Sequence, residues 1–161
     1  MNDSPHPKLL SRPELLRRRE TWRRSGRRIA FTNGCFDLLH RGHVESLEMA
    51  AQHGEMLIVG LNDDDSVRRL KGAGRPLQSV EDRIIVLGAL TCISWITVFG
   101  ETSVEPLIRA LLPDCLVKGG DYSPDQIVGA EAVEAAGGQV VVTPHVQHAS
   151  TSDLLRRLER S

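Results

Sequence analysis

Lysine is scarce in this chain of 161 residues, which also has few cysteines, no long apolar leader and almost no net charge. The three cysteines form no CxxC pair, which argues against a disulfide framework or a structural zinc site and predicts a reducing compartment, the cytoplasm. The net charge of −1 provides no overall field that would favour nucleic acid or a membrane surface. No apolar run follows the first basic residues, so no secretory signal is expected.

Sequence motifs of two common nucleotide-binding folds are absent as well. No GxxxxGK[ST] occurs and no complete GxGxxG follows a strand, which excludes a P-loop NTPase and a dinucleotide dehydrogenase. The stretch Ile84–Gly100 carries no formal charge, but polar residues and glycine interrupt it and it is shorter than the ~20 residues of a membrane span. We therefore expect a single soluble domain with a substantial core.

Positive charge is concentrated near the N-terminus, where eight arginines lie from Arg12 to Arg28. We interpret residues 1–26 as an Arg-rich helical extension that precedes a domain of residues 27–161. A solvated helix is the simplest reading, and an anionic partner or an oligomer contact is the alternative. The acids within the segment argue against a transit peptide. Its few apolar residues cannot support an isolated helix, so it is expected to dock on the domain or on another subunit.

Short apolar strands alternate with helical patterns along the rest of the chain. Because the strands are apolar on both faces, the pattern predicts an α/β fold: one Rossmann-like domain with a five-stranded parallel sheet and helices on both faces. The loops that follow the strands would gather at one sheet edge, where ligands of such folds bind. The expected strands are 28–33, 56–61, 95–99, 115–117 and 139–142. The expected helices are 44–51, 80–90, 104–112, 126–136 and 153–158. Residues 62–76 are expected to form a polar loop.

The sequence His40-Arg41-Gly42-His43 lies between the first expected strand and the helix that follows it. A helix N-terminus offers unpaired backbone N–H groups and the positive end of the helix dipole, which attract phosphate. Two imidazoles three residues apart add donors at the same place, and Gly42 lets the backbone approach an anion closely. Helix capping by a surface histidine is the alternative for an isolated HxxH. The surrounding strand and glycine turn favour a phosphate cradle.

A family resemblance rests on an ordered set of segments: FTNGCFDLLHRGH at 31–43, LKG at 70–72 with RP at 75–76, the stretch 83–90, VKGGDY at 117–122 and STS at 150–152. Together they resemble the HxGH nucleotidylyltransferases of the cytidylyltransferase-like family, and among these most closely the heptose 1-phosphate adenylyltransferase domains of the ADP-heptose pathway. The resemblance spans nearly the whole chain. It implies transfer of a nucleotide from ATP to heptose 1-phosphate, with Mg²⁺ carried by the triphosphate and with a homodimer as the assembly. The partners would be small molecules, not nucleic acid or membrane.

The resemblance also implies roles for individual residues. His40, His43 and Lys71 would act in catalysis, while Arg75 and Arg83 would bind the phosphate of the acceptor. No metal ligands are implied within the protein. The residues expected to bind the nucleotide are Asn33, Gly34, Cys35, Phe36, Asp37, Gly42, Lys118, Gly119, Asp121, Ser150, Thr151 and Ser152.

Alternatives remain open at several of these positions. Arg83 could instead pair with Glu81 or Asp82, and the carboxylates of Asp37 and Asp121 could bind Mg²⁺ or a ribose hydroxyl, or cap a turn. The acidic run at 62–65 could hold a metal but fits a cap of the next turn better, and the STS segment could cap a helix.

The closing loop departs from the related enzymes, because His145 and His148 stand where cytidylyltransferases carry an arginine and a glycine. The sequence also leaves the nucleotide base and the acceptor open. The same chemistry with another phosphorylated alcohol, or with GTP or CTP, is one alternative, and a regulatory module that binds nucleotide without catalysis is another.

Overall fold

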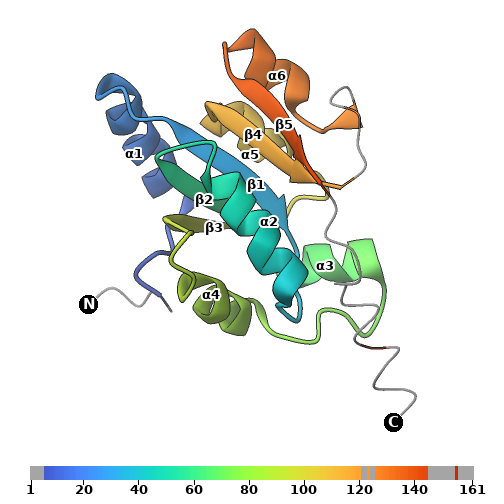
Figure 1. The fold of residues 1–161 in the computed structure, drawn as a ribbon. Helices are drawn as coiled ribbons and strands as arrows, with labels where there is room; N and C mark the ends of the chain where they lie inside the picture. The colour runs from blue at the N-terminus through green and yellow to red at the C-terminus, as the bar shows by residue number, and fades with distance from the viewer. Residues whose placement is uncertain (1–5, 121–122, 124–125, 145–154, 156–161) are drawn as a thin grey trace.

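The computed structural model describes residues 6–120, 123, 126–144 and 155. Five parallel strands form one sheet in the order β3-β2-β1-β4-β5 (Figure 1). The order reverses between β1 and β4, the position at which α/β sheets bind ligands. This sheet confirms the predicted fold class. The strands are β1 (Ile29–Gly34), β2 (Met56–Asn62), β3 (Trp95–Phe99), β4 (Cys115–Gly119) and β5 (Gln139–Thr143).

Helices cover both faces of the sheet, and each face has its own apolar cluster. One cluster joins residues of α1, α5 and α6, and the other joins residues of α2 and α4. The central strand β2 is buried along its whole length, as expected for a strand covered on both faces. The helices are α1 (Arg12–Arg24), α2 (Arg41–Ala51), α3 (Asp64–Lys71), α4 (Val80–Gly88), α5 (Glu105–Leu111) and α6 (Ala130–Ala135).

The N-terminal segment packs onto the domain itself. Leu15 of α1 is fully buried, and the buried guanidinium of Arg19 pairs with Asp114 at 3.0 Å. Before α1, Leu10 donates its backbone N–H to the Ile96 carbonyl, so this segment pairs alongside β3 at the sheet edge. The apolar stripe of α1 is therefore satisfied within the chain.

Two regions differ from the sequence expectation. Residues 62–76 contain the helix α3, which a pattern search overlooks because α3 buries only one apolar side chain, Val67. Helix α6 begins four residues later than expected because Gly129 adopts a left-handed backbone with φ 85°. Among the described residues, no helix is both long and apolar enough to cross a bilayer. The expected helix at 153–158 lies outside the described residues, apart from position 155.

Candidate functional site

The histidine motif begins α2, directly after the loop that leaves β1. His40 is the N-cap of the helix, and its Nδ1 accepts a hydrogen bond from the Gly42 N–H at 3.1 Å. Because Nδ1 is the acceptor, a neutral His40 carries its proton on Nε2, the nitrogen that does not cap the helix. The capping and binding readings of this histidine are therefore compatible.

The second histidine stacks on the first. The ring centroids of His40 and His43 are 3.8 Å apart with an interplanar angle of 22°, and Phe36 packs edge-on against His43 at 5.3 Å. Burial and, to a smaller extent, the charge of His40 together lower the pKa of His43 to about 4, while the charge of Asp37 opposes the shift. Its Nδ1 is buried and has no hydrogen-bond partner among the described residues. A neutral imidazole with an unpartnered nitrogen thus lies beside the helix N-terminus.

The loop between β1 and α2 is held in a strained conformation. Phe36 and Leu38 both adopt left-handed backbones, with φ 47° and 56°, which non-glycine residues rarely do. A side chain at Gly34 would meet the Phe36 ring at 3.0 Å. Such strain persists only where surrounding contacts enforce it, and it is often found at binding sites.

Hydrogen bonds to Asp37 help to hold this loop in its strained conformation. Its carboxylate accepts hydrogen bonds from Arg75 Nε at 2.7 Å and from the backbone N–H groups of Leu77 and Gln78 at 2.9 and 3.0 Å. Burial raises the pKa of Asp37, but these hydrogen bonds outweigh it and hold the pKa below its usual value. The side chain of Gln78 in turn accepts a hydrogen bond from the Leu38 N–H at 3.2 Å. Asp37 therefore joins the cradle loop to the loop before α4, which favours the turn reading over the Mg²⁺ reading.

Arg83 connects the same loops from inside the protein. Its guanidinium is fully buried and donates to the carbonyls of Cys35, Asn62 and Gln78 at 2.7, 2.8 and 3.2 Å. It also pairs with Asp64 at 2.7 Å, and not with Glu81 or Asp82, the partners considered from sequence. This arrangement favours a positioning role for Arg83 over direct contact with a substrate phosphate.

Cations gather around the cradle. The charges of Lys71, Arg83 and Arg75 all act on Cys35, where they oppose the increase in the thiol pKa that burial causes. Lys71 is the last residue of α3 and is exposed. Across the switch in strand order, Lys118 Nζ donates to Asn33 Oδ1 at 3.4 Å, and burial lowers the pKa of this lysine.

The run at 62–65 is a helix cap. Asp63 is the N-cap of α3 and accepts from the Ser66 N–H at 2.7 Å, while Asp64 binds Arg83. The described residues contain no group of three or more metal-ligating side chains. Sequence reasoning missed the contributions of Gln78 and Asn62, and no local motif indicates either of them.

The structure therefore brings together the candidates in β1, the cradle loop, α2 and the end of β4, which include Gly34, Gly42 and Gly119. Asp121, Ser150, Thr151 and Ser152 lie outside the described residues, as do His145 and His148.

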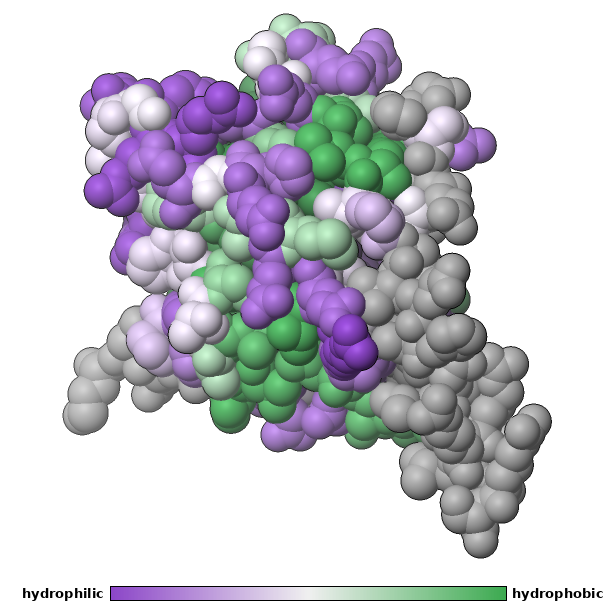
Figure 2. Space-filling model, in the orientation of Figure 1, coloured by the Kyte–Doolittle hydropathy of each residue, from purple (hydrophilic) through white to green (hydrophobic). Residues whose placement is uncertain are grey.

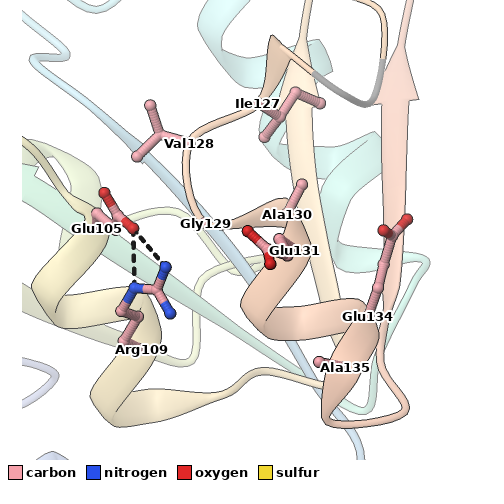
Figure 3. Close-up of a pocket in the computed structure, with 9 residues that line it drawn as sticks. All are labelled: Glu105, Arg109, Ile127, Val128, Gly129, Ala130, Glu131, Glu134 and Ala135. Carbon is pink, nitrogen blue, oxygen red and sulfur yellow. Dashed lines mark hydrogen bonds and ion pairs between the residues drawn. The ribbon is translucent and has the colours of Figure 1, made fainter.

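A separate hollow of about 590 Å³ lies between α5 and α6 (Figure 3). Glu105 and Arg109 of α5 pair with each other on one side of it, and Glu131 and Glu134 of α6 line the other. None of the candidate site residues that the structure describes lines this hollow, and its described lining contains no histidine. The histidine pair at the N-terminus of α2 thus lies at a different place in the fold from this hollow.

Comparison with known families agrees with this geometry. The family described as Cytidylyltransferase-like matches residues 31–157. The chain belongs to this family. The match confirms the resemblance drawn from the ordered sequence segments, and its range includes the loop, the histidine pair and the end of β4.

Curated relatives extend the comparison along the sequence. The chain is 51% identical over 150 residues to the bifunctional protein HldE of Halorhodospira halophila, covering 93% of this chain and 31% of that protein. It is 48% identical over 152 residues to the bifunctional protein HldE of Pseudomonas paraeruginosa, covering 94% and 32%. The chain thus spans about a third of the length of these relatives.

Solved structures resemble the fold at lower sequence identity. The lipopolysaccharide core biosynthesis protein of Thermoplasma volcanium superposes with a TM-score of 0.61 at 20% identity, covering 77% of this chain and all of that one. Pantoate-beta-alanine ligase of Francisella tularensis, complexed with beta-gamma ATP and beta-alanine, gives 0.62 at 13% identity, covering 94% and 76%. At these identities the comparison establishes the fold alone.

Proposed function

We propose that this protein is an adenylyltransferase that joins ATP to heptose 1-phosphate, giving ADP-heptose and pyrophosphate. The observation that carries the proposal is the stacked pair of His40 and His43 at the N-terminus of α2, beside the switch in strand order. The sequence identity of 51% and 48% to HldE proteins along most of the chain supports it. The choice of ATP and heptose rests on the resemblance of the sequence segments.

The proposed reaction is an in-line displacement. A phosphate oxygen of heptose 1-phosphate attacks the α-phosphorus of ATP, a new P–O bond forms, and the bond to the β-phosphate bridge breaks, releasing pyrophosphate. Such a transfer needs positioning and charge neutralisation more than covalent catalysis. His40, His43 and the amides of α2 would bind the triphosphate, with Lys71 neutralising charge as pyrophosphate leaves.

The remaining candidates fit around that centre. Lys118 and Asn33 meet across the switch point, where we place the nucleoside. Arg75 is half-buried and bound to Asp37, with part of its guanidinium available to an acceptor phosphate. Arg83 holds the loops that carry these groups.

We further propose that Mg²⁺ arrives with the nucleotide, because phosphate oxygens are its preferred ligands in such reactions. Asp37, a carboxylate of the loop before α2, is bound by Arg75 and two backbone amides, so the phosphates would supply most of the metal's coordination. We also propose a cytoplasmic homodimer that acts on small molecules and binds neither nucleic acid nor membrane.

Pyrophosphate release tests the proposal. The protein is incubated with ATP, GTP or CTP and Mg²⁺, each with heptose 1-phosphate, glucose 1-phosphate or glycerol 3-phosphate. We expect release with ATP and heptose 1-phosphate, at least tenfold above the other pairs. Release with a different pair would keep the chemistry and replace the substrate, while nucleotide binding without release from any pair would favour the regulatory module.

A further inference from the structure

The segment between α3 and α4 runs past the N-terminal end of α2, where the two stacked histidines lie (Figure 1). The buried carboxylate of Asp37 fixes three groups of this segment. One of its oxygens accepts hydrogen bonds from Arg75 Nε and from the Leu77 N–H, and the other accepts from the Gln78 N–H. Arg75, Leu77 and Gln78 are therefore held next to one another beside the cradle loop.

Two of these residues present groups of opposite character. The guanidinium of Arg75 uses only Nε, and its two terminal amino groups form no hydrogen bond with the described residues, so they can bind a phosphate. The side chain of Leu77 is 50% exposed, although its backbone is anchored on Asp37. Polar and apolar groups thus lie next to each other here, as they do more widely around α4 (Figure 2).

The third residue holds its side-chain amide against the cradle loop. Gln78 Oε1 accepts a hydrogen bond from the Leu38 N–H at 3.2 Å, which leaves the NH₂ group of the amide as a donor. This nitrogen has no hydrogen-bond partner among the described residues, and it is not one of the buried polar atoms that lack a partner. Gln78 therefore offers a solvent-accessible donor close to the residues that precede His40.

The sheet order places this group on one side of the cradle. The segment of Arg75 and Leu77 follows β2 and α3, whereas Lys118 lies on β4, and β2 and β4 flank β1 on opposite sides. Lys118 meets Asn33 on the β4 side, where the proposed function places the nucleoside. The β2 side is then left for the acceptor.

We propose that Leu77 and Gln78 form the sugar subsite of the acceptor and determine which phosphorylated alcohol the protein accepts. The inference rests on the proposed function, in which Arg75 binds the acceptor phosphate. The phosphate of a sugar 1-phosphate is attached directly to the ring, so a phosphate on Arg75 puts the ring beside Leu77 and Gln78.

The two side chains match the two kinds of surface that a sugar ring presents. Leu77 packs against the C–H face of the ring, and Gln78 donates to a ring hydroxyl. Small-molecule sites commonly combine apolar contact with a few fixed polar groups that set the orientation of the ligand. An exposed leucine alone carries no such meaning. The position of Leu77 between a phosphate-binding guanidinium and a fixed amide carries the inference.

Calorimetry of acceptor binding tests the apolar contact. The full chain, saturated with Mg²⁺ and α,β-methylene ATP, is titrated with heptose 1-phosphate or with the sugar 1-phosphate that the pyrophosphate assay selects. Leu77→Ser keeps the backbone hydrogen bond to Asp37. It should raise the Kd of the sugar phosphate roughly three- to tenfold, the effect of losing half the burial of a leucine side chain.

Val128→Ser is the matched control, because Val128 is 48% exposed and lies beside α6, away from the cradle. This variant should leave the Kd of the sugar phosphate unchanged. Both variants should bind α,β-methylene ATP as the unmodified protein does.

Analogues of the acceptor that each lack one hydroxyl test the contact of Gln78. In the unmodified protein, loss of the recognised hydroxyl should raise Kd roughly two- to tenfold, the scale of one neutral hydrogen bond. In Gln78→Met the same loss should have no further effect. Any change that Gln78→Met causes at Leu38 is common to all the acceptors, so it cancels in this comparison.

The outcomes separate the subsite from the proposed function. Unchanged acceptor binding by Leu77→Ser, or an equal loss in Val128→Ser, would overturn the role of Leu77. A hydroxyl deletion that costs as much in Gln78→Met as in the unmodified protein, for every analogue, would overturn the contact of Gln78. An unmodified protein that binds no sugar phosphate would instead refute the proposed function, and the sugar subsite with it.

Discussion

In the proposed reaction, the protonation state of His43 determines how the cradle binds a triphosphate. With a pKa of about 4, its imidazole is neutral at physiological pH, and its Nδ1 lacks a partner among the described residues. A bound triphosphate brings negative charge, which favours the imidazolium and should raise this pKa by more than about one unit. Binding should then be accompanied by proton uptake.

Titration of the His43 ring by NMR, with and without ATP, measures this shift directly. The ring chemical shifts of His53, just beyond the C-terminal end of α2, serve as the control and should not respond to ATP. A pKa for His43 that is unchanged at saturating ATP would contradict its assignment to the phosphate site.

Removal of the imidazole is expected to affect catalysis more than folding. His43→Ala should lower turnover by roughly 10²–10⁴-fold, the usual effect of losing one positioned group in a transition state. His53→Ala should leave turnover within about twofold because it lies outside the cradle. Steady-state kinetics measures the loss of turnover, and circular dichroism shows whether the variant is folded. Normal turnover of a folded His43→Ala variant would refute the assignment of His43 to the catalytic site.

At the scale of secondary-structure elements, Arg83 makes α4 part of the site without exposing a side chain to substrate. Arg83→Met would leave Asp64 and three carbonyls without their buried donor, and should lower the free energy of unfolding by about 3–5 kcal/mol. Arg17→Met removes a largely exposed pair with Glu14 and should cost less than about 1 kcal/mol.

Urea unfolding of both variants provides the comparison. Arg83→Lys keeps the charge but cannot reach all four acceptors, so it should fall between the unmodified protein and Arg83→Met. Equal stability of Arg83→Met and the unmodified protein would show that the buried network does not hold the loops.

Elements with enough apolar residues were predictable from the sequence. Trp95–Phe99 was placed without error, and the predicted first strand was displaced by one residue from Ile29–Gly34. Helix α3 was missed because its eight residues bury only Val67, too few for a periodic signal. The N-cap residue Asp63 is the feature of the sequence that indicates this helix.

The same distinction applies to the candidate site, because residues that are contiguous in sequence were predictable and residues joined only by tertiary contacts were not. The histidine cradle could be predicted because strand, glycine turn, HxGH and helix are contiguous in sequence. The network of Arg83 could not, because its acceptors Cys35, Asn62 and Gln78 come from three separate segments. Whether a side chain binds substrate or its own loops depends on tertiary contacts, which no local pattern reports.

At the scale of the whole molecule, nucleotide binding should stabilise the entire domain, because the cradle connects β1, α2, α3 and α4 around one sheet. A ligand at 100 times its dissociation constant adds about 2.7 kcal/mol to the folded state. For a domain of this size that corresponds to an increase in Tm of roughly 5–11 °C. We therefore expect ATP with Mg²⁺ to raise the midpoint of thermal unfolding by this amount.

Differential scanning fluorimetry with increasing ATP measures the effect, and Lys118→Met provides the comparison. Lys118 is partly buried at the switch point against Asn33, so its removal should reduce the ATP-dependent shift by more than half. Arg17→Met, far from the cradle, should keep the full shift. An absent shift in the unmodified protein at saturating ATP would contradict nucleotide binding, because any ligand that binds only the folded state must stabilise it.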